Sequence, residues 1–257
     1  MQRFFVTFPL TIDLILTDLD IVHQLTRVLR VQIWEEIVLF DGDGSETLYE
    51  VTDITKKALS LRGKDRKFPN TEPTRNITLY QAMPNKIEKV EYILQKWVEV
   101  GIAKFIFFRS DRSQKLVLSE AKKSRFFAIA REALEQCGGL VMPEIEFTDQ
   151  VLSFCHSDAG RICSSADYET GQILHTSGWQ EREKASHIVL DTTGVLQKMH
   201  GMPQNREISI WVGPEGGWSE NEREKMRDNG FIFARFGERV LRTETAGVVI
   251  AFSLLYA

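Results

Sequence analysis

Short apolar runs separated by turn residues occupy the first part of the chain. FFVTF, EIVLF, TLYEV and ALSLRG read as strands, and Asp-Gly-Asp-Gly at residues 41–44 lies between EIVLF and TLYEV. Because glycine adopts the positive φ angles of tight hairpin loops, these four residues predict a hairpin. The pattern predicts a small β-rich domain over residues 1–72, and two prolines among polar residues predict a linker at residues 67–76.

After the linker, apolar strands alternate with amphipathic helices. ITLYQAM, KFIFFRS, HIVLD, EISIWVG and FIFARFG read as buried strands. Apolar residues recur at helical spacing in residues 85–101 and 119–139, each of which ends in glycine, whereas residues 145–185 carry weaker signals. Strands alternating with helices indicate an α/β fold with a parallel sheet covered on both faces. Ligands of such sheets bind at the carboxyl ends of the strands.

One helical segment is predicted inside the β-rich domain. HQLTRVLRV, residues 23–31, places Leu25, Val28 and Leu29 on one face of a turn or two, with Arg27 and Arg30 on the other.

Composition narrows the functional classes. The 257 residues are 43% hydrophobic and 26% charged, as in ordinary globular proteins. No apolar run reaches the roughly 18 residues of a membrane span, and the amino terminus lacks the apolar core of a signal peptide, so we expect a cytoplasmic protein without a membrane partner. Cys137, Cys155 and Cys163 show no C-x-x-C spacing, which predicts reduced thiols and no metal site.

Positive charge is concentrated in one part of a chain whose net charge is −4. Lys86 to Arg131 contains eleven Lys and Arg residues against five Asp and Glu, a balance of +6, whereas Glu132 to the end has eleven against nineteen, a balance of −8. A region of this kind is able to neutralise several phosphates of a nucleic acid. A solvated helical surface is an equally weighted alternative.

The loop GPEGG, residues 213–217, joins a predicted strand to a predicted helix. Ser219 and Glu222 have capping-box spacing, so the helix is expected to begin at Ser219. The glycines allow backbone amides to approach a ligand closely. Neither a dinucleotide fingerprint nor a phosphate-binding P-loop is present, and Glu215 repels phosphate, so we expect a ligand with hydroxyls, amines or positive charge. A tight connection without a ligand is the alternative.

A second strand, glycine turn and helix follow in RFGERVLRTETAGVVIAFSLLYA. We expect the turn at Gly237 and the loop 213–217 to form two walls of one pocket. The last helix lacks a polar face, so its own core or another subunit must enclose it. The charges before this helix either pair internally, as Arg242 with Glu244 or Glu215, or face a substrate.

The motifs GPEGGWSENE and FGERVLRTETA resemble the hallmark loops of the RsmE family of ribosomal RNA methyltransferases, in the SPOUT superfamily. HQLTRVLR with FDGDG is similar to the family's PUA-like barrel, and SDRSQK and REALEQCGG are similar to two further family segments. The resemblance implies a PUA-like β-barrel RNA-binding domain over residues 1–72. It implies a SPOUT methyltransferase domain over residues 73–257, whose carboxyl-terminal third forms a trefoil knot.

The family resemblance also implies an activity and its partners. The protein would use S-adenosylmethionine to methylate N3 of a specific uridine in 16S ribosomal RNA of the small subunit, acting as a homodimer. The cofactor would lie against the following residues: Leu190, Gly213, Pro214, Glu215, Gly216, Gly217, Phe236, Gly237, Val240, Leu241 and Thr243.

Methyl transfer to N3 requires the loss of the N3 proton. We expect Arg112 and Arg242 to stabilise the charge that forms on the base, and Glu244 to accept the proton or to hold an arginine. Arg239 is expected to orient an RNA phosphate or the knot loop. Residues predicted to contact RNA are Arg27, Arg30, Lys86, Lys89, Arg109, Lys115, Lys122, Lys123, Arg125 and Arg239.

The sequence departs from the family pattern at Gln95, Val98 and Gly139, so RNA affinity or rate is expected to differ, although cofactor binding is not. Two other functions stay open. One is a non-catalytic RNA-binding protein of ribosome assembly, which needs no glycine loops. The other is an enzyme of the same fold that acts on tRNA or a small molecule.

Overall fold

The computed structural model describes residues 2–113, 118–148, 153–154, 162–163, 186–196 and 205–256. The chain divides into two compact units. The first unit contains Met1–Glu72 and Arg131–Met142, and the second contains Pro73–Ala130 and Pro143–Ala257.

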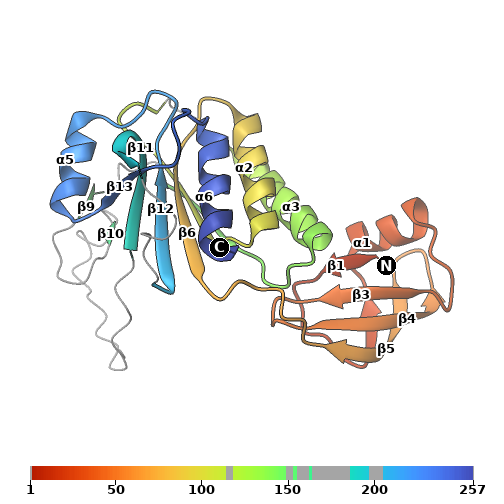
Figure 1. Cartoon of the computed structure of the whole chain (residues 1–257). Helices are drawn as coiled ribbons and strands as arrows, with labels where there is room; N and C mark the ends of the chain where they lie inside the picture. The colour runs from red at the N-terminus through yellow and green to blue at the C-terminus, as the bar shows by residue number, and fades with distance from the viewer. Residues whose placement is uncertain are drawn as a thin grey trace. The chain divides into compact units, whose positions relative to one another are not determined.

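The first unit is an open, mixed sheet with a short helical segment (Figure 1). Its strand order is β1-β3-β4-β5-β2, in which β1 pairs in parallel with β3 and the other neighbours are antiparallel. The elements are β1 (Arg3–Phe5), β2 (Asp13–Leu16), α1 (Leu19–His23), the π-helical turn η1 (Gln24–Val28), β3 (Glu36–Phe40), β4 (Glu46–Ile54) and β5 (Leu59–Lys67).

The predicted Asp-Gly-Asp-Gly hairpin is confirmed. Antiparallel β3 and β4 flank it, with φ angles of 89° at Gly42 and 86° at Gly44. Both angles lie in the left-handed region that favours glycine. Along β4, buried positions such as Tyr49 and Val51 alternate with partly exposed ones, so one face of the strand packs on the core of the first unit.

The predicted helical segment at residues 23–31 is only partly right. The helix begins earlier, at Leu19, and continues as a π-helical turn to Val28. Leu25 is buried, but Val28, predicted on the same face, is 66% exposed. The i→i+5 hydrogen bonds of a π-helix widen the turn, so residues spaced for an α-helical face no longer lie on one side.

The second unit is built on a six-stranded sheet in the order β13-β11-β12-β6-β7-β8, with all neighbours parallel. The predicted α/β fold class is confirmed. Its elements are β6 (Asn76–Ala82), α2 (Ile87–Val100), β7 (Lys104–Phe108), α3 (Glu120–Cys137, whose end belongs to the first unit), β8 (Glu144–Thr148), the antiparallel pair β9 (Ser153–Phe154) and β10 (Ile162–Cys163), β11 (Ser186–Leu196), β12 (Glu207–Val212), α5 (Glu220–Asp228), β13 (Ile232–Arg235) and α6 (Thr243–Tyr256).

Helices cover both faces of this sheet. Val189 of β11 pairs in register with Trp211 of β12 on one face, where Met226 of α5 joins the same apolar cluster. The next pair, Leu190 with Val212, points to the opposite face, on the side of α6. On that side α6 packs against β12 and beside α2 (Figure 1).

The edge strand β8 lies in the part of the sequence whose signals were weak. It is partly exposed, and cross-strand ion pairs support it: Lys104 of β7 contacts Glu144 at 3.0 Å and Glu146 at 2.6 Å. These ion pairs between charged side chains leave no apolar periodicity in the sequence, so the pattern of apolar residues does not predict β8.

No helix in the described part of the chain is long and apolar enough to cross a membrane. The described residues also contain no group of three or more His, Cys, Asp or Glu side chains placed to hold a metal ion. The trefoil knot stays a prediction, because residues 197–204, between β11 and β12, lie outside the described residues.

Candidate functional site

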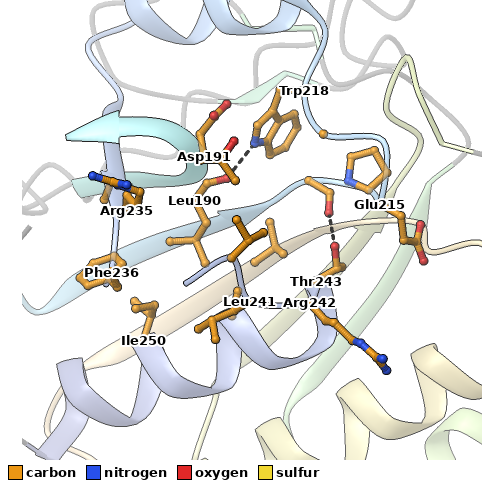
Figure 2. A pocket seen from close by; sticks show the side chains of 18 of the residues that line it. Leu190, Asp191, Glu215, Trp218, Arg235, Phe236, Leu241, Arg242, Thr243 and Ile250 are labelled. Atoms are coloured by element: carbon orange, nitrogen blue, oxygen red, sulfur yellow. Dashed lines mark hydrogen bonds between the residues drawn. The ribbon is translucent and has the colours of Figure 1, made fainter. Parts of the chain in front are cut away.

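A cavity of about 550 Å³ lies where three neighbouring strands of the second unit end. Leu190, Val212 and Ala234 pair in register across β12, β11 and β13, and all three line the cavity. Ile250 of α6 and Leu241 add to this apolar surface (Figure 2). The cavity therefore lies at the carboxyl ends of parallel strands, where the fold class predicts a ligand.

Both glycine-containing segments line this one cavity, as predicted. A hydrogen bond connects them: the Thr243 hydroxyl donates to the carbonyl oxygen of Gly213 at 3.1 Å (Figure 2). Positive φ angles of 69° at Gly217 and 97° at Gly237 allow the two turns. The first turn of α6 is thus held against the loop 213–217.

Most residues predicted to contact the cofactor lie around the cavity. Gly216 and Gly237 are not part of its lining, and a Cβ on Gly216 would lie 3.4 Å from the Cβ of Arg112. The predicted residues that line the cavity are Leu190, Gly213, Pro214, Glu215, Gly217, Phe236, Val240, Leu241 and Thr243.

Lys89 contacts two of the carboxylates that line the cavity. Its Nζ donates to Glu215 Oε1 at 2.6 Å and lies 3.8 Å from Glu244 Oε2. Burial acts to raise the pKa of Glu215, but the hydrogen bond from Lys89 and those from backbone amides outweigh it and lower that pKa. Glu244 Oε2 is buried and accepts no hydrogen bond from the described residues.

Of the two alternatives for the charges before α6, internal pairing through Arg242 is not found among the described residues. Neither Glu215 nor Glu244 pairs with Arg242; both face Lys89, which had been predicted to contact RNA. Arg242 is exposed and lines the cavity, and its side chain forms no hydrogen bond or ion pair with the described residues. Figure 2 shows its side chain extending away from the apolar side chains of Leu241 and Ile250. Its guanidinium is free to meet a substrate.

Arg112 has a different position from Arg242. It follows β7, is not part of the cavity lining, and donates from Nη1 to the carbonyl oxygen of Gly216 at 3.0 Å. Arg112 thus contacts the outer side of the loop 213–217. Arg239 is exposed on the cavity wall and has no side-chain partner among the residues described.

The sequence interpretation missed Trp218, the residue that follows the glycine loop. Its indole is buried and donates from Nε1 to the carbonyl oxygen of Leu190 at 3.1 Å (Figure 2). The same ring stacks near Phe108, with 6.2 Å between ring centroids. Trp218 therefore connects the loop 213–217 to the middle of β11, and its only sequence signal is its place beside the glycines.

Glu222 ties the start of α5 to the segment after β7. The predicted capping box with Ser219 is confirmed: Ser219 N–H donates to Glu222 Oε2 at 2.8 Å, and Glu222 N–H donates to the Ser219 hydroxyl at 3.1 Å. Oε1 of the same buried carboxylate accepts the Ser110 hydroxyl at 2.7 Å and the Asp111 N–H at 3.0 Å. The Glu222 carboxylate therefore joins the start of α5 to the segment after β7, next to the loop 213–217.

A second buried acid at the cavity was also missed. Asp191 Oδ2 accepts from Arg223 Nε at 2.8 Å, and its side chain is 2% exposed. Oδ1 accepts the N–H and the hydroxyl of Thr193, each at 2.8 Å. Burial acts to raise the pKa of Asp191, but Arg223 and Thr193 together lower it. Asp191 and Arg223 are 32 positions apart, so no local pattern indicates this pair.

This pair predicts a pH-dependent stability. Because the folded pKa of Asp191 is depressed, its stabilisation is present above the unfolded value, near 3.9, and is lost as the pH falls through the folded pKa. We expect Asp191→Asn to lower the free energy of unfolding by about 2–3 kcal/mol at pH 7 and by much less at pH 3. Urea unfolding at both pH values checks this, and an equal loss at both would contradict it.

The residues predicted to contact RNA differ in their surroundings. Lys123 pairs with Glu120 and Arg125 with Glu91, which agrees with the alternative of a solvated helical surface for this part of the basic region. Lys115 lies outside the described residues. Side chains with no hydrogen bond or ion pair to any described residue are those of Arg27, Arg30, Lys86, Arg109, Lys122 and Arg239.

The structure also shows where the three departures from the family pattern lie, at Gln95, Val98 and Gly139. Val98 is buried in α2, whereas Gln95 is exposed on the same helix. The carbonyl oxygen of Gly139, in the first unit, accepts a hydrogen bond from Arg3 Nη2 at 3.3 Å. Of the two departures in α2, only Gln95 presents its side chain to solvent.

Comparisons with known proteins agree with this site. Residues 16–62 match an RNA methyltransferase PUA domain. "Ribosomal RNA small subunit methyltransferase E" of Buchnera aphidicola is 28% identical over 235 residues, which cover 90% of this chain and 83% of that protein. The Bacillus subtilis protein of the same name is 26% identical over 238 residues, covering 91% and 87%.

A solved structure is similar over almost the whole chain. It is the ribosomal RNA small subunit methyltransferase E of Neisseria gonorrhoeae bound to S-adenosyl methionine, with a TM-score of 0.76, 26% identity and coverage of 98% of this chain and 95% of that one. Residues 70–255 match the sequence model of the RNA methyltransferase domain. Because that match spans well over half of the sequence, the chain belongs to the RNA methyltransferase domain family.

Proposed function

We propose that this protein is an S-adenosylmethionine-dependent methyltransferase that modifies N3 of a specific uridine in 16S ribosomal RNA of the small subunit. The observation that carries the proposal is the one cavity at the carboxyl-terminal side of the sheet that both glycine-containing segments line. Relatives named as small-subunit ribosomal RNA methyltransferases support the substrate class.

The cavity suits this cofactor in size and chemistry. Its volume of about 550 Å³ lies within the usual range for small-molecule sites. Leu190, Val212, Leu241 and Ile250 offer apolar surface to an adenine ring. The lining carries charges of both signs, with four acids (Asp191, Glu215, Glu238 and Glu244) and five cations (Lys89, Arg223, Arg235, Arg239 and Arg242). When bound, S-adenosylmethionine supplies an electrophilic methyl group.

The side chains around the cavity take separate roles in this proposal. Arg242, which is exposed and free of partners among the described residues, stabilises the negative charge that develops on the uridine when N3 is deprotonated. Glu244 accepts the N3 proton at Oε2, the buried oxygen without a hydrogen bond. Arg112 positions the loop 213–217 through the Gly216 carbonyl.

RNA binding in this proposal combines phosphate contacts with an accessible base. N3 lies on the pairing edge of uridine, so the target must be unpaired or flipped out when it reacts. The partner-free cations are candidates for phosphate contacts, which set register and depend steeply on salt. These candidates are Arg27, Arg30, Lys86, Arg109, Lys122 and Arg239.

A homodimer is part of the proposal, and the apolar face of α6 supports it. Val249, Phe252 and Tyr256 are all exposed on this helix although they are apolar or aromatic. Tyr92 of the neighbouring α2 is exposed as well. Exposed apolar patches of this kind are typical of subunit interfaces.

The test is a methylation assay with a labelled methyl donor. Small-subunit particles, free 16S RNA and tRNA are incubated side by side with the protein, and nucleosides from each RNA are separated to identify the product. We expect label at N3 of uridine in small-subunit RNA only. Label in tRNA would favour a different RNA substrate. No label, together with no cofactor binding by calorimetry, would favour a non-catalytic assembly protein.

A further inference from the structure

An exposed tryptophan in the first unit takes no part in the proposed cavity. Trp34 is 73% exposed, whereas Trp97, Trp211 and Trp218, the other tryptophans among the described residues, are buried. Indole combines a large apolar surface with one polar group, and tryptophan is enriched where proteins bind partners. The surroundings of Trp34 indicate which partner it suits.

The backbone at Trp34 is strained. Its φ angle is 77°, in the left-handed region that favours glycine, and that of Arg30 is 55°. Hydrogen bonds fix this conformation: Trp34 N–H donates to the Val51 carbonyl at 2.8 Å, and Val51 N–H donates to the Glu35 carbonyl at 3.0 Å. A bulky side chain kept at a position that favours glycine points to a function for the side chain itself.

Two exposed arginines precede Trp34 in the same segment of the chain. Residues 23–34 contain Arg27 and Arg30 and no acid. Both arginines are exposed and have no side-chain partner among the described residues. The acids that follow are engaged: the Glu35 carboxylate accepts the Gln32 N–H at 2.9 Å, and Glu36 pairs with Lys64 at 3.1 Å.

An exposed aromatic ring in the same segment as two exposed arginines that have no side-chain partner among the described residues suits single-stranded nucleic acid. Unpaired bases stack on aromatic rings, and arginines neutralise the phosphates on either side. Trp34 also falls within residues 16–62, the part of the chain that matches an RNA methyltransferase PUA domain. Charge complementarity therefore favours RNA over a neutral apolar partner.

We propose that Trp34 is a stacking platform for an unpaired base of the RNA substrate, with Arg27 and Arg30 neutralising the adjoining phosphates. The inference rests on the proposed function in taking RNA as the substrate. It adds a contact that the family motifs do not indicate, in a unit that contributes no residue to the cavity.

Trp34→Gly tests the platform because it moves stability and RNA affinity in opposite directions. Glycine relieves the strained φ angle, so the midpoint of thermal unfolding should stay equal or rise. Loss of the stacked ring should weaken binding of a labelled single-stranded RNA oligonucleotide by about five- to hundredfold in fluorescence anisotropy. Trp34→Phe, which keeps an aromatic ring, should retain most of the affinity.

The salt dependence separates stacking from phosphate contacts. Trp34→Gly should leave the slope of log affinity against log salt unchanged, whereas Arg27→Ala and Arg30→Ala should each reduce it by about one. Ile12→Ala is the matched control, because Ile12 is an equally exposed apolar residue of the same unit and should not affect RNA binding. Equal RNA affinities for Trp34→Gly and the unchanged chain would overturn the platform.

The two proposals fail separately. If the unchanged chain methylates small-subunit RNA but Trp34→Gly binds RNA as tightly, only the platform is wrong. If no RNA is methylated while Trp34→Gly still weakens RNA binding, the proposed enzymatic function is wrong and the platform stands.

Discussion

Replacing Arg242 by alanine is expected to lower the rate of RNA methylation by about 10²–10³-fold while the protein still binds S-adenosylmethionine. Arg242 lines the cavity and is exposed, and its side chain has no hydrogen bond or ion pair with the described residues, so truncation to alanine breaks no side-chain hydrogen bond or ion pair seen among them. Its expected contribution is to stabilise charge developing on the base, and removal of one such group typically has this magnitude. Single-turnover methyl transfer and calorimetry with the cofactor measure the two effects separately.

Arg239→Ala is the matched control for this prediction. Arg239 is another exposed arginine on the same wall of the cavity, three positions earlier, and it also has no side-chain partner among the described residues. Loss of a phosphate contact should weaken RNA binding and reduce the salt slope by about one, without a large change in the rate at saturating RNA. Unchanged turnover in Arg242→Ala would remove Arg242 from the chemistry and leave Glu244 as the remaining candidate at the cavity.

Replacing Gly247 by alanine is expected to destabilise the second unit by about 3 kcal/mol or more. A Cβ at this position would lie 1.7 Å from Cζ2 and 2.4 Å from Cη2 of Trp97, which is buried in α2. The overlap forces α6 away from α2, and overpacking of this kind is costly. In a helix without such a contact, alanine would instead stabilise by about 0.5–1 kcal/mol relative to glycine.

A double-mutant cycle with Trp97→Leu isolates the cause. Leucine lacks the indole atoms that meet the added Cβ, so Gly247→Ala should cost little or even stabilise in that background. Urea unfolding of the four proteins gives the coupling energy between the two positions. The same penalty in both backgrounds would show that contact with Trp97 is not the reason for glycine at this site.

Local signals predicted most of the elements because their causes are local. The helix over residues 85–101 has its apolar residues at helical spacing and ends at Gly101, whose φ of 92° in the structure matches the left-handed residue that closes a helix. The capping box of Ser219 and Glu222 also needs only neighbours in sequence. Where the local geometry departs from the α-helix, as in the π-helical turn that exposes Val28, the same reasoning failed.

The features of the cavity also divide into those that sequence patterns predicted and those that they did not. The glycine motifs and their place at strand ends followed from the alternation of strands and helices and from family resemblance. The contacts of Lys89 with Glu215 and Glu244 did not follow from these patterns, because both acids lie more than 120 residues after Lys89 in the chain. A lysine on an amphipathic helix has the same sequence pattern whether it faces water or an acid contributed by a distant loop.

The amino-acid sequence by itself thus determined the α/β class, the hairpin and capped helix, and the two segments that meet at the strand ends. The tertiary structure alone decided which distant polar groups meet: the ion pairs of Lys89 with Glu215 and of Asp191 with Arg223, and the hydrogen bond from Ser110 to the buried Glu222. The physical reason is that helix periods, caps and turns depend on neighbours within a few residues, whereas ion pairs and buried hydrogen bonds depend on distances between segments that only the packed sheet brings together.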